Sequence, residues 1–116
     1  MIEKGKNYGW PVISGDKTQT GMEKPIINSG TDTWAPAGAA YYNGSIFFGG
    51  LRGQALFEYN IENKTLTSHL KGEIGRIREV VFGSDNLLYI TASNRDGRGI
   101  PDATDDKIIR VNPAKL

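Results

Sequence analysis

The fold is decided by residues 39–51, which read AAYYNGSIFFGGL. Two runs of small, aromatic and aliphatic residues flank Asn43-Gly44, and this dipeptide is the strongest short-range signal for a β-hairpin. Both of its residues tolerate the positive φ angles that a type I′ turn demands. We therefore expect a strand over 39–42, a tight turn, and a returning strand over 46–51.

The next residues continue this pattern towards the C-terminus. In the segment 55–61, Phe57, Tyr59 and Ile61 alternate with polar residues, which predicts a strand with one buried face. Asn63 and Lys64 form the next turn signal, and a fourth strand is expected over 66–70. Four consecutive antiparallel strands make a meander.

The pattern then restarts, with strands expected over 76–82, 87–93 and 107–111. When the turn at 43–45 is aligned with 84–86, residues 46–48 fall on 87–89, an offset of 41 positions. Four-stranded units that repeat at roughly 40–45 residues are typical of β-propeller blades. The predicted fold is therefore all-β, with antiparallel four-stranded blades. A sandwich of two sheets is the alternative.

This pattern divides the chain into three segments. Residues 34–72 are the first predicted blade and residues 73–116 a second, incomplete one. Residues 1–33 are interrupted by glycines and prolines throughout, so we expect an irregular N-terminal segment with one or two short strands. No stretch has convincing helical spacing with caps, and we expect little helix.

Composition excludes several classes of protein. The 116 residues suffice for one modest hydrophobic core, and a net charge of +1 argues against a nucleic-acid partner. No apolar run approaches the roughly 18–20 residues that span a bilayer, and the N-terminus lacks the apolar stretch of a signal peptide, so we expect a soluble chain. With no cysteine and a single histidine, a thiolate nucleophile or a multi-histidine metal site cannot be built from one chain. We expect His69 on the surface.

Three arginines are candidates for binding an anion. Arg76 and Arg78 are two positions apart in a predicted strand, so both guanidinium groups should point to one side. Two convergent arginines suit a ligand with several carboxylates. The alternatives are an ion pair with Glu79 or a solvated face. Arg52 lies in a glycine-rich bend that can approach a ligand or serve as a plain turn.

Two further stretches carry candidate residues. Trp34, which follows Thr33, can stack on a planar ligand or be buried at the edge of a blade. The loop 94–106 contains four aspartates within eleven residues, and oxygen-rich loops of this kind can take calcium. The spacing is not that of an EF-hand, and Arg95 and Arg98 neutralise part of the charge. We therefore interpret it as a solvated loop and assign no metal ligand.

Five motifs together resemble a known family. In order along the chain they read GKNYGWP (5–11), WAPAG (34–38), GGLR (49–52), GRIREV (75–80) and DNLLYI (85–90). They are similar to the C-terminal third of the soluble sugar dehydrogenases that depend on pyrroloquinoline quinone (PQQ), a family of glucose and aldose sugar dehydrogenases on a six-bladed β-propeller. The resemblance extends over about residues 2–114.

The resemblance implies a set of contacts to the cofactor. Arg76 and Arg78 match the family's arginine pair, Arg52 falls where the family has a basic residue, and the last two contacts implied are Thr33 and Trp34. PQQ is planar and carries three carboxylates, so arginines and an aromatic cover are suitable partners for it. An intact member of this family is periplasmic or extracellular.

The resemblance also implies that important parts lie outside this sequence. The family's catalytic histidine and its calcium ligands come from segments upstream of the GKNYGWP motif, and His69 matches no catalytic position. We therefore expect part of a sugar dehydrogenase that holds cofactor-binding residues and has neither the catalytic histidine nor the calcium site. Its partners would be the missing blades and a small sugar.

Two other hypotheses remain open. The chain can be a blade module that assembles with copies of itself, because three copies of two blades would supply six blades. It can also be a calcium-dependent sugar-binding module that uses the acidic loop.

Overall fold

The chain forms two compact units that divide between Thr33 and Trp34. The computed structural model describes residues 2–116; Met1, the first residue of the predicted N-terminal segment, lies outside the described residues. Of the described residues, none belongs to a helix long and apolar enough to cross a membrane.

The first unit is irregular, and the expectation of one or two short strands in it is wrong. Residues 2–33 contain turns and bends but no strand. Their backbone hydrogen bonds are mostly local; for example, the N–H groups of Val12 and Ile13 both donate to the carbonyl of Gly9. The chain reverses too often at glycines with positive φ for a ladder to extend.

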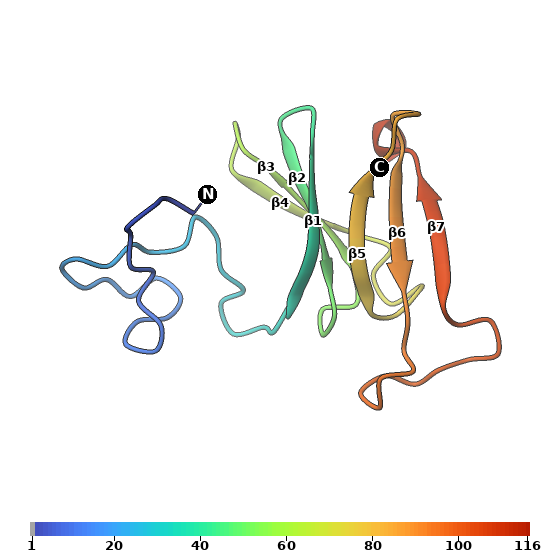
Figure 1. The fold of residues 1–116 in the computed structure, drawn as a ribbon, viewed down its shortest axis with the longest axis horizontal. Coiled ribbons are helices and arrows are strands. Elements are labelled where there is room, and N and C mark those ends of the chain that lie inside the picture. Colours follow the sequence, from blue (N-terminus) through green and yellow to red (C-terminus); the bar gives the residue numbers. More distant parts are fainter. Residues whose placement is uncertain (1) are drawn as a thin grey trace. The chain divides into compact units, whose positions relative to one another are not determined.

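The second unit begins with a four-stranded antiparallel meander in the order β1-β2-β3-β4. Its strands are β1 (Pro36–Tyr42), β2 (Ser45–Gly50), β3 (Leu56–Asn60) and β4 (Thr65–His69). The predicted type I′ turn is confirmed, since Asn43 and Gly44 have φ angles of 45° and 84°. Figure 1 shows this sheet in green and yellow-green.

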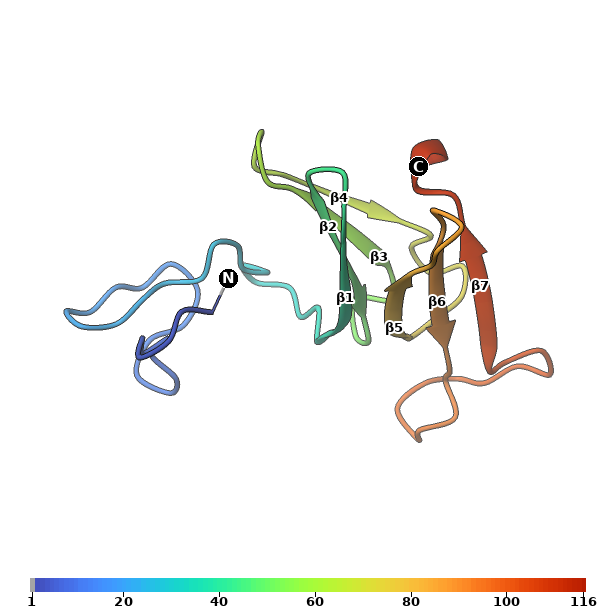
Figure 2. The ribbon, with the colours of Figure 1, turned by 45° about the horizontal axis from the view of Figure 1, so that its top comes forward.

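A second antiparallel sheet follows, with three strands in the order β5-β6-β7. Its strands are β5 (Ile77–Phe82), β6 (Leu88–Ala92) and β7 (Lys107–Val111), and a short 3-10 helix (Pro113–Lys115) follows. The prediction of an all-β fold is thus confirmed, with one sheet of four strands and one of three. Figure 2 shows the long loop that leaves the end of β6 and returns to the start of β7.

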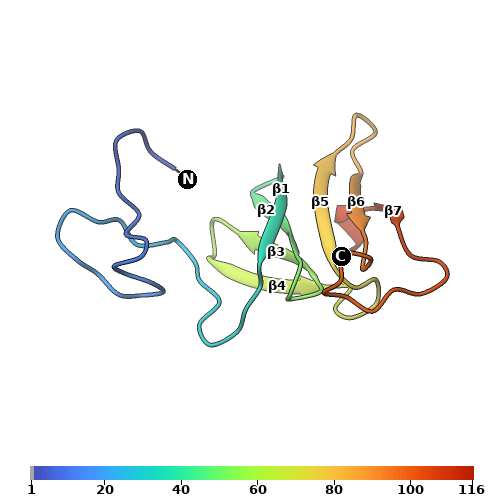
Figure 3. The same ribbon diagram turned by 60° about the horizontal axis from the view of Figure 1, so that its bottom comes forward.

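The two sheets pack against each other through their first strands. Figures 1 and 3 both show β1 lying beside β5. The hydrophobic core lies between the sheets, and its fully buried members are Phe47, Leu56, Ile77, Val80, Leu88 and Ile90. Phe47 and Leu88, which are 41 positions apart, are equivalent residues of β2 and β6 and meet in this core. The structural repeat therefore matches the offset seen in the sequence.

Glycine allows the sheets to approach closely. A Cβ atom on Gly49 of β2 would lie 2.7 Å from Ile77 Cγ2 and 2.8 Å from the Ile77 carbonyl oxygen. A Cβ on Gly38 of β1 would lie 2.6 Å from Glu79 Cα. Both distances are shorter than real Cβ contacts, so a larger residue at either position would push the sheets apart.

Both first strands also contain a bulge near this contact. The register shifts between Ala37 and Ala39 in β1, and between Ile77 and Glu79 in β5, so Gly38 and Arg78 are the extra residues. A bulge re-aims the side chain of its extra residue. In β5 that side chain belongs to one of the candidate arginines.

The strand boundaries differ from the predicted ones by one to three residues. The start of β1 is three residues earlier than expected, because Pro36 and Ala37 pair with Gly50 and Gly49 across the bulge. The start of β5 is at Ile77, so Arg76 precedes the strand. The strand β6 is one residue shorter at each end than expected, and β7 lies where the sequence places it.

Candidate functional site

Arg76 and Arg78 converge on one carboxylate. The Asp96 Oδ2 atom lies 2.9 Å from Arg76 Nη2 and 2.8 Å from Arg78 Nη2, and it also accepts from Arg76 Nε at 3.2 Å. The predicted convergence of the two guanidinium groups is therefore present in the structure. It arises differently from the expected way, because Arg76 precedes β5 and Arg78 occupies its bulge.

Asp96 is the partner of both arginines, and the sequence reasoning did not predict this pairing. One alternative to a ligand site was an ion pair between the arginines and Glu79. In the structure, Glu79 Oε1 instead accepts a hydrogen bond from the Val80 N–H. A signal for Asp96 was available in the hairpin register: Ile77 pairs with Ala92, so the residues that follow β6 lie beside the residue that precedes β5. A correct prediction of this register would have placed residues 93–96 beside Arg76.

The two arginines keep the Asp96 carboxyl ionised. A hydrogen bond from Arg78 is the largest cause, and the Arg98 N–H and the charge of Arg76 add to it, so the pKa of Asp96 is held well below its usual range although partial burial opposes this. The carboxylate is therefore charged at neutral pH.

Arg76 is buried and links the two sheets. Its side chain is 7% exposed, and its Nη1 atom donates to the Leu51 carbonyl oxygen at 3.1 Å, in the loop that follows β2. Its backbone N–H donates to Asn94 Oδ1 at 3.0 Å. Arg78 is more open, with a side chain that is 34% exposed and an Nε atom that donates to the Ser93 carbonyl at 3.2 Å.

Backbone hydrogen bonds connect Trp34 and Arg52 to this cluster. The Trp34 carbonyl accepts from the N–H groups of Arg52 and Gly53 at 3.1 and 3.0 Å, and Leu51, which receives Arg76, is the residue before Arg52. Arg52 is exposed, and among the described residues its side chain has no ion pair. Arg52 is therefore an exposed basic residue one position after the carbonyl that binds Arg76.

The aromatic ring of Trp34 packs on the first sheet. Its centroid lies 5.3 Å from that of Phe57 and 5.9 Å from that of Phe48. Because Phe47 faces the second sheet, the neighbouring Phe48 points to the opposite face, and Trp34 lies there as a half-buried ring. Thr33 is the last residue of the first unit, and its side chain is exposed.

Each aspartate of the acidic loop has a partner within the chain. Asp96 binds the arginines, Asp102 accepts from the N–H and hydroxyl of Thr104, and Asp106 pairs with Arg95 at 3.0 Å. Asp105 accepts from the backbone and the side chain of Asn94. Within residues 2–116, no group of three or more carboxylates or histidines is arranged to hold a metal ion.

His69 is not the surface residue that we expected. Its side chain is 14% exposed, and Nε2 lies 3.0 Å from Glu58 Oε2. Glu58 also accepts a hydrogen bond from the buried Ser45 hydroxyl at 2.7 Å. His69 pairs with the fully buried Leu56 in the β3–β4 ladder, which places it on the face that packs against the second sheet. It is part of a structural polar cluster.

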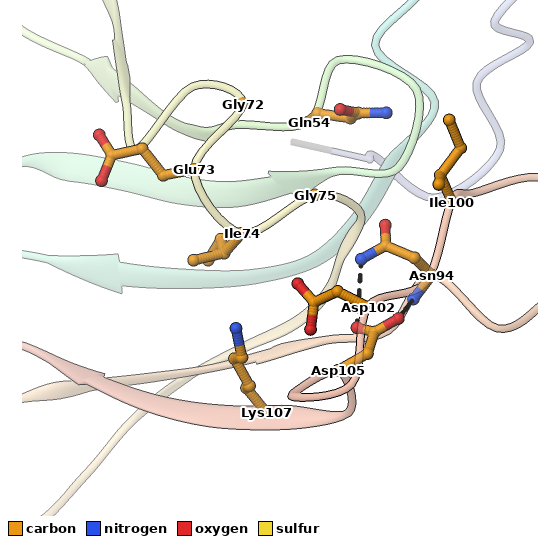
Figure 4. Close-up of a pocket in the computed structure, with 10 residues that line it drawn as sticks. All are labelled: Gln54, Gly72, Glu73, Ile74, Gly75, Asn94, Ile100, Asp102, Asp105 and Lys107. Carbon is orange, nitrogen blue, oxygen red and sulfur yellow. Dashed lines mark hydrogen bonds between the residues drawn. The ribbon is translucent and has the colours of Figure 1, made fainter.

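A pocket of about 220 Å³ lies next to the arginine cluster. Figure 4 shows the carboxylates of Asp102 and Asp105 and the ammonium of Lys107 among its lining, with Asn94 bonded to Asp105. Glu73 adds a third acidic residue. The carboxylates that line this pocket outnumber its cationic groups and would repel an anionic ligand. The arginine cluster is therefore the better candidate for the anion site.

Comparison with known proteins identifies the family. The family model described as glucose/sorbosone dehydrogenase matches residues 1–109. The chain belongs to this family. An uncharacterised protein of Synechocystis sp. is 30% identical over 119 residues, which cover 84% of this chain and 29% of the relative. The aldose sugar dehydrogenase YliI of Escherichia coli is 26% identical over 134 residues, which cover 96% of this chain and 34% of the relative.

Two solved structures of glucose/sorbosone dehydrogenase relatives resemble the fold. The PQQ-bound form of the aldose sugar dehydrogenase from Streptomyces coelicolor has a TM-score of 0.85 and 37% identity, and it matches 94% of this chain and 34% of its own. A Thermus thermophilus protein described as an oxidoreductase (glucose dehydrogenase) has a TM-score of 0.86 and 36% identity, with 96% and 35% covered. The chain spans about a third of the length of the relatives it matches.

Proposed function

We propose that this chain is part of a PQQ-dependent aldose or glucose dehydrogenase and that its arginine cluster contributes to the cofactor site. The observation that supports this most strongly is the convergence of Arg76 and Arg78 beside the loop of Arg52. It occurs in a chain that is 37% identical to a protein whose structure holds PQQ. Trp34 and Thr33 are the further contacts that we propose, at the start of the second unit and the end of the first.

The donor set of this cluster suits the cofactor. PQQ carries three carboxylates on a planar ring system, and each guanidinium can give two parallel hydrogen bonds to a carboxylate. The cluster holds two arginines and one aspartate and is therefore cationic. A bound quinone would supply the hydride acceptor for the sugar, and the part of this chain would be to bind and orient the quinone.

We also propose that the two sheets are two blades of a six-bladed propeller. The sheets pack face to face through β1 and β5 around glycines, and β1 and β2 are related to β5 and β6 by the 41-residue offset. One third of a relative's length corresponds to two of six blades.

Titration with PQQ tests the cofactor site. The purified 116-residue chain should quench its tryptophan fluorescence on adding PQQ, and Arg76→Ala/Arg78→Ala should weaken binding at least tenfold, since both proposed carboxylate partners are removed. Arg110→Ala, an exposed arginine of β7, is the matched control and should bind like the parent. Equal affinity of the double variant and the parent would remove the cluster from consideration.

The isolated chain should not oxidise sugars. Its one histidine, His69, is hydrogen-bonded to Glu58 on the face between the sheets and is not available as a base for the sugar hydroxyl. We expect no reduction of a dye when the 116-residue chain is given glucose, PQQ and calcium. A turnover above that of PQQ alone would contradict this part of the proposal.

A second candidate function is a self-assembling blade module. The observation that favours it is the outer face of β5–β7, where Val81 and Ile108 are 51% and 75% exposed, opposite the core residues of the same strands. In this case a second copy would cover the face that a further blade covers in a complete ring.

A further inference from the structure

Asp96 touches both members of the arginine pair and is fixed at both of its carboxylate oxygens. We propose that Asp96 is a positioning residue of the anion site, which holds the Arg76 and Arg78 guanidinium groups convergent so that Arg78 presents its free donors to the ligand. The identity of the ligand as PQQ rests on the proposed function. The geometry of Asp96 and the two arginines is independent of it.

The first argument is how Asp96 is anchored. Its Oδ2 atom receives Arg76 and Arg78, while its Oδ1 atom accepts from the Arg98 N–H at 3.1 Å in the turn of its own loop. A carboxylate that merely occupied the ligand's place would be held by the arginines alone. Here the loop fixes one oxygen and the arginines bind the other, which makes Asp96 a part of the scaffold.

The second argument is the different exposure of the two arginines. Arg76 is 7% exposed, and it uses Nε, Nη1 and Nη2 in contacts to Asp96 and Leu51. Arg78 is 34% exposed and uses Nε and Nη2, so its Nη1 group has no partner among the described residues. Arg76 therefore serves mainly as an anchor, and Arg78 offers most of the donors that a ligand can reach.

The third argument compares the charge that Asp96 removes from the cluster with the side-chain order that it provides. Asp96 lowers the net charge of the cluster by one, and this alone weakens the attraction for an anion. In return it fixes a long side chain with many rotamers before the ligand arrives, so less entropy is lost on binding. Positioning and competition therefore predict opposite signs when the charge of Asp96 is removed.

The experiment compares Asp96→Asn with the parent chain. Asparagine keeps the Oδ1 acceptor for the Arg98 N–H and removes the charge from the other end. We expect the PQQ dissociation constant to rise about tenfold, as for other residues that support a ligand-binding group. Asp102→Asn, in the same loop and bonded to Thr104, is the matched control and should leave it unchanged. Tighter or unaltered PQQ binding by Asp96→Asn would overturn the proposal.

A ligand-free measurement separates positioning from general stability. In ¹⁵N-labelled parent protein, the Arg76 and Arg78 Nε–H signals should exchange slowly with water, and in Asp96→Asn the Arg78 signal should exchange at least tenfold faster while the backbone amides of β5 and β6 stay protected. Unchanged Arg78 exchange overturns the proposal, and so does loss of protection throughout the sheet.

Citrate, a second tricarboxylate, distinguishes this proposal from the proposed function. If the parent chain binds citrate but not PQQ, and Asp96→Asn weakens citrate binding, the proposed function fails and the positioning role stands. A parent chain that binds neither probe overturns both.

Discussion

Arg76 and Arg78 are two positions apart, yet they stand in different environments. Arg76 is buried between the sheets and bonded to the Leu51 carbonyl, whereas a third of the Arg78 side chain reaches solvent. The convergence expected from their spacing is present, but it arises from the bulge at Arg78 and not from strand periodicity. The spacing could not predict this inequality, because burial depends on the loop after β2, which is 25 positions away from Arg76.

The two arginines should therefore contribute unequally to stability. Arg76→Ala removes charge-assisted hydrogen bonds to Asp96 and Leu51 in a buried place, and we expect the free energy of unfolding to fall by about 2–3 kcal/mol. Arg78→Ala removes a more exposed pair and should cost about 1 kcal/mol or less. Urea unfolding followed by circular dichroism measures both; equal losses would contradict the assigned environments.

The pKa of Asp96 predicts how its contribution depends on pH. Arg78, the Arg98 N–H and Arg76 hold the folded-state pKa of Asp96 below the unfolded value near 4, so the folded state binds the proton less readily. The stabilisation is therefore complete above about pH 4 and is lost as the pH falls towards the folded pKa.

The measurement is the difference in stability between the parent and Asp96→Asn. Asp102 and Asp105 also have lowered pKa values, but they are present in both proteins and cancel. The parent should be the more stable protein at pH 6, and the difference should shrink steadily from pH 4 to pH 2 in thermal unfolding. A difference that does not vary with pH would show that the ion pairs do not stabilise the fold.

At the scale of strands and turns, the sequence was most informative where local chemistry decides the structure. Asn43-Gly44 specified its turn because few residues tolerate positive φ angles. The boundaries of all seven strands lie within three residues of the predicted ones. The sequence did not predict the bulges at Gly38 and Arg78, because they lie at the close contact between β1 and β5, which is not a local feature of the sequence. The first unit has no strand because its aliphatic residues are too scattered between turns.

Burial in the second sheet predicts a contrast between two isoleucines on neighbouring strands. Ile90 of β6 is fully buried between the sheets, whereas Ile108 of β7 is 75% exposed on the opposite face. Ile90→Ala should cost about 2–5 kcal/mol because it leaves a cavity, and Ile108→Ala should stay within about 0.5 kcal/mol of the parent. Similar losses at the two sites, measured by urea unfolding, would contradict the packing of this sheet.

At the scale of the whole molecule, the exposed outer face of β5–β7 bears on self-association. Ile108 lies on this face in a cross-strand row with Thr91 and Glu79, and Val81 lies in the next row with Tyr89 and Arg110. Two exposed aliphatic side chains on one sheet face favour association with another copy. We expect sedimentation velocity of the 116-residue chain to show association that increases with protein concentration.

Charge on that face should oppose the association. Ile108→Lys places a cation on the outer face and should shift the population towards monomer, while Ile61→Lys, in the turn between β3 and β4, should not. A parent chain that sediments as a monomer at every concentration would contradict the self-assembling module, and a defined trimer would favour the closed ring.

The family could be identified from the sequence, whereas the site could be identified only in part. Motifs such as GRIREV carry the family because they are contiguous. Asp96 was missed because its relation to Arg76 exists only once β5 and β6 have paired with the correct register.

The pairing of Arg76 and Arg78 with Asp96 has a consequence for inheritance. All three residues, and the Ser93 carbonyl that receives Arg78, come from one β-hairpin with its flanking residues, and the Leu51 carbonyl, a backbone group that any amino acid supplies, completes the cluster. A recombination event that moved residues 75–98 would carry the three charged side chains and the Ser93 carbonyl together. The three charged side chains can thus be inherited together while the sheets around them diverge.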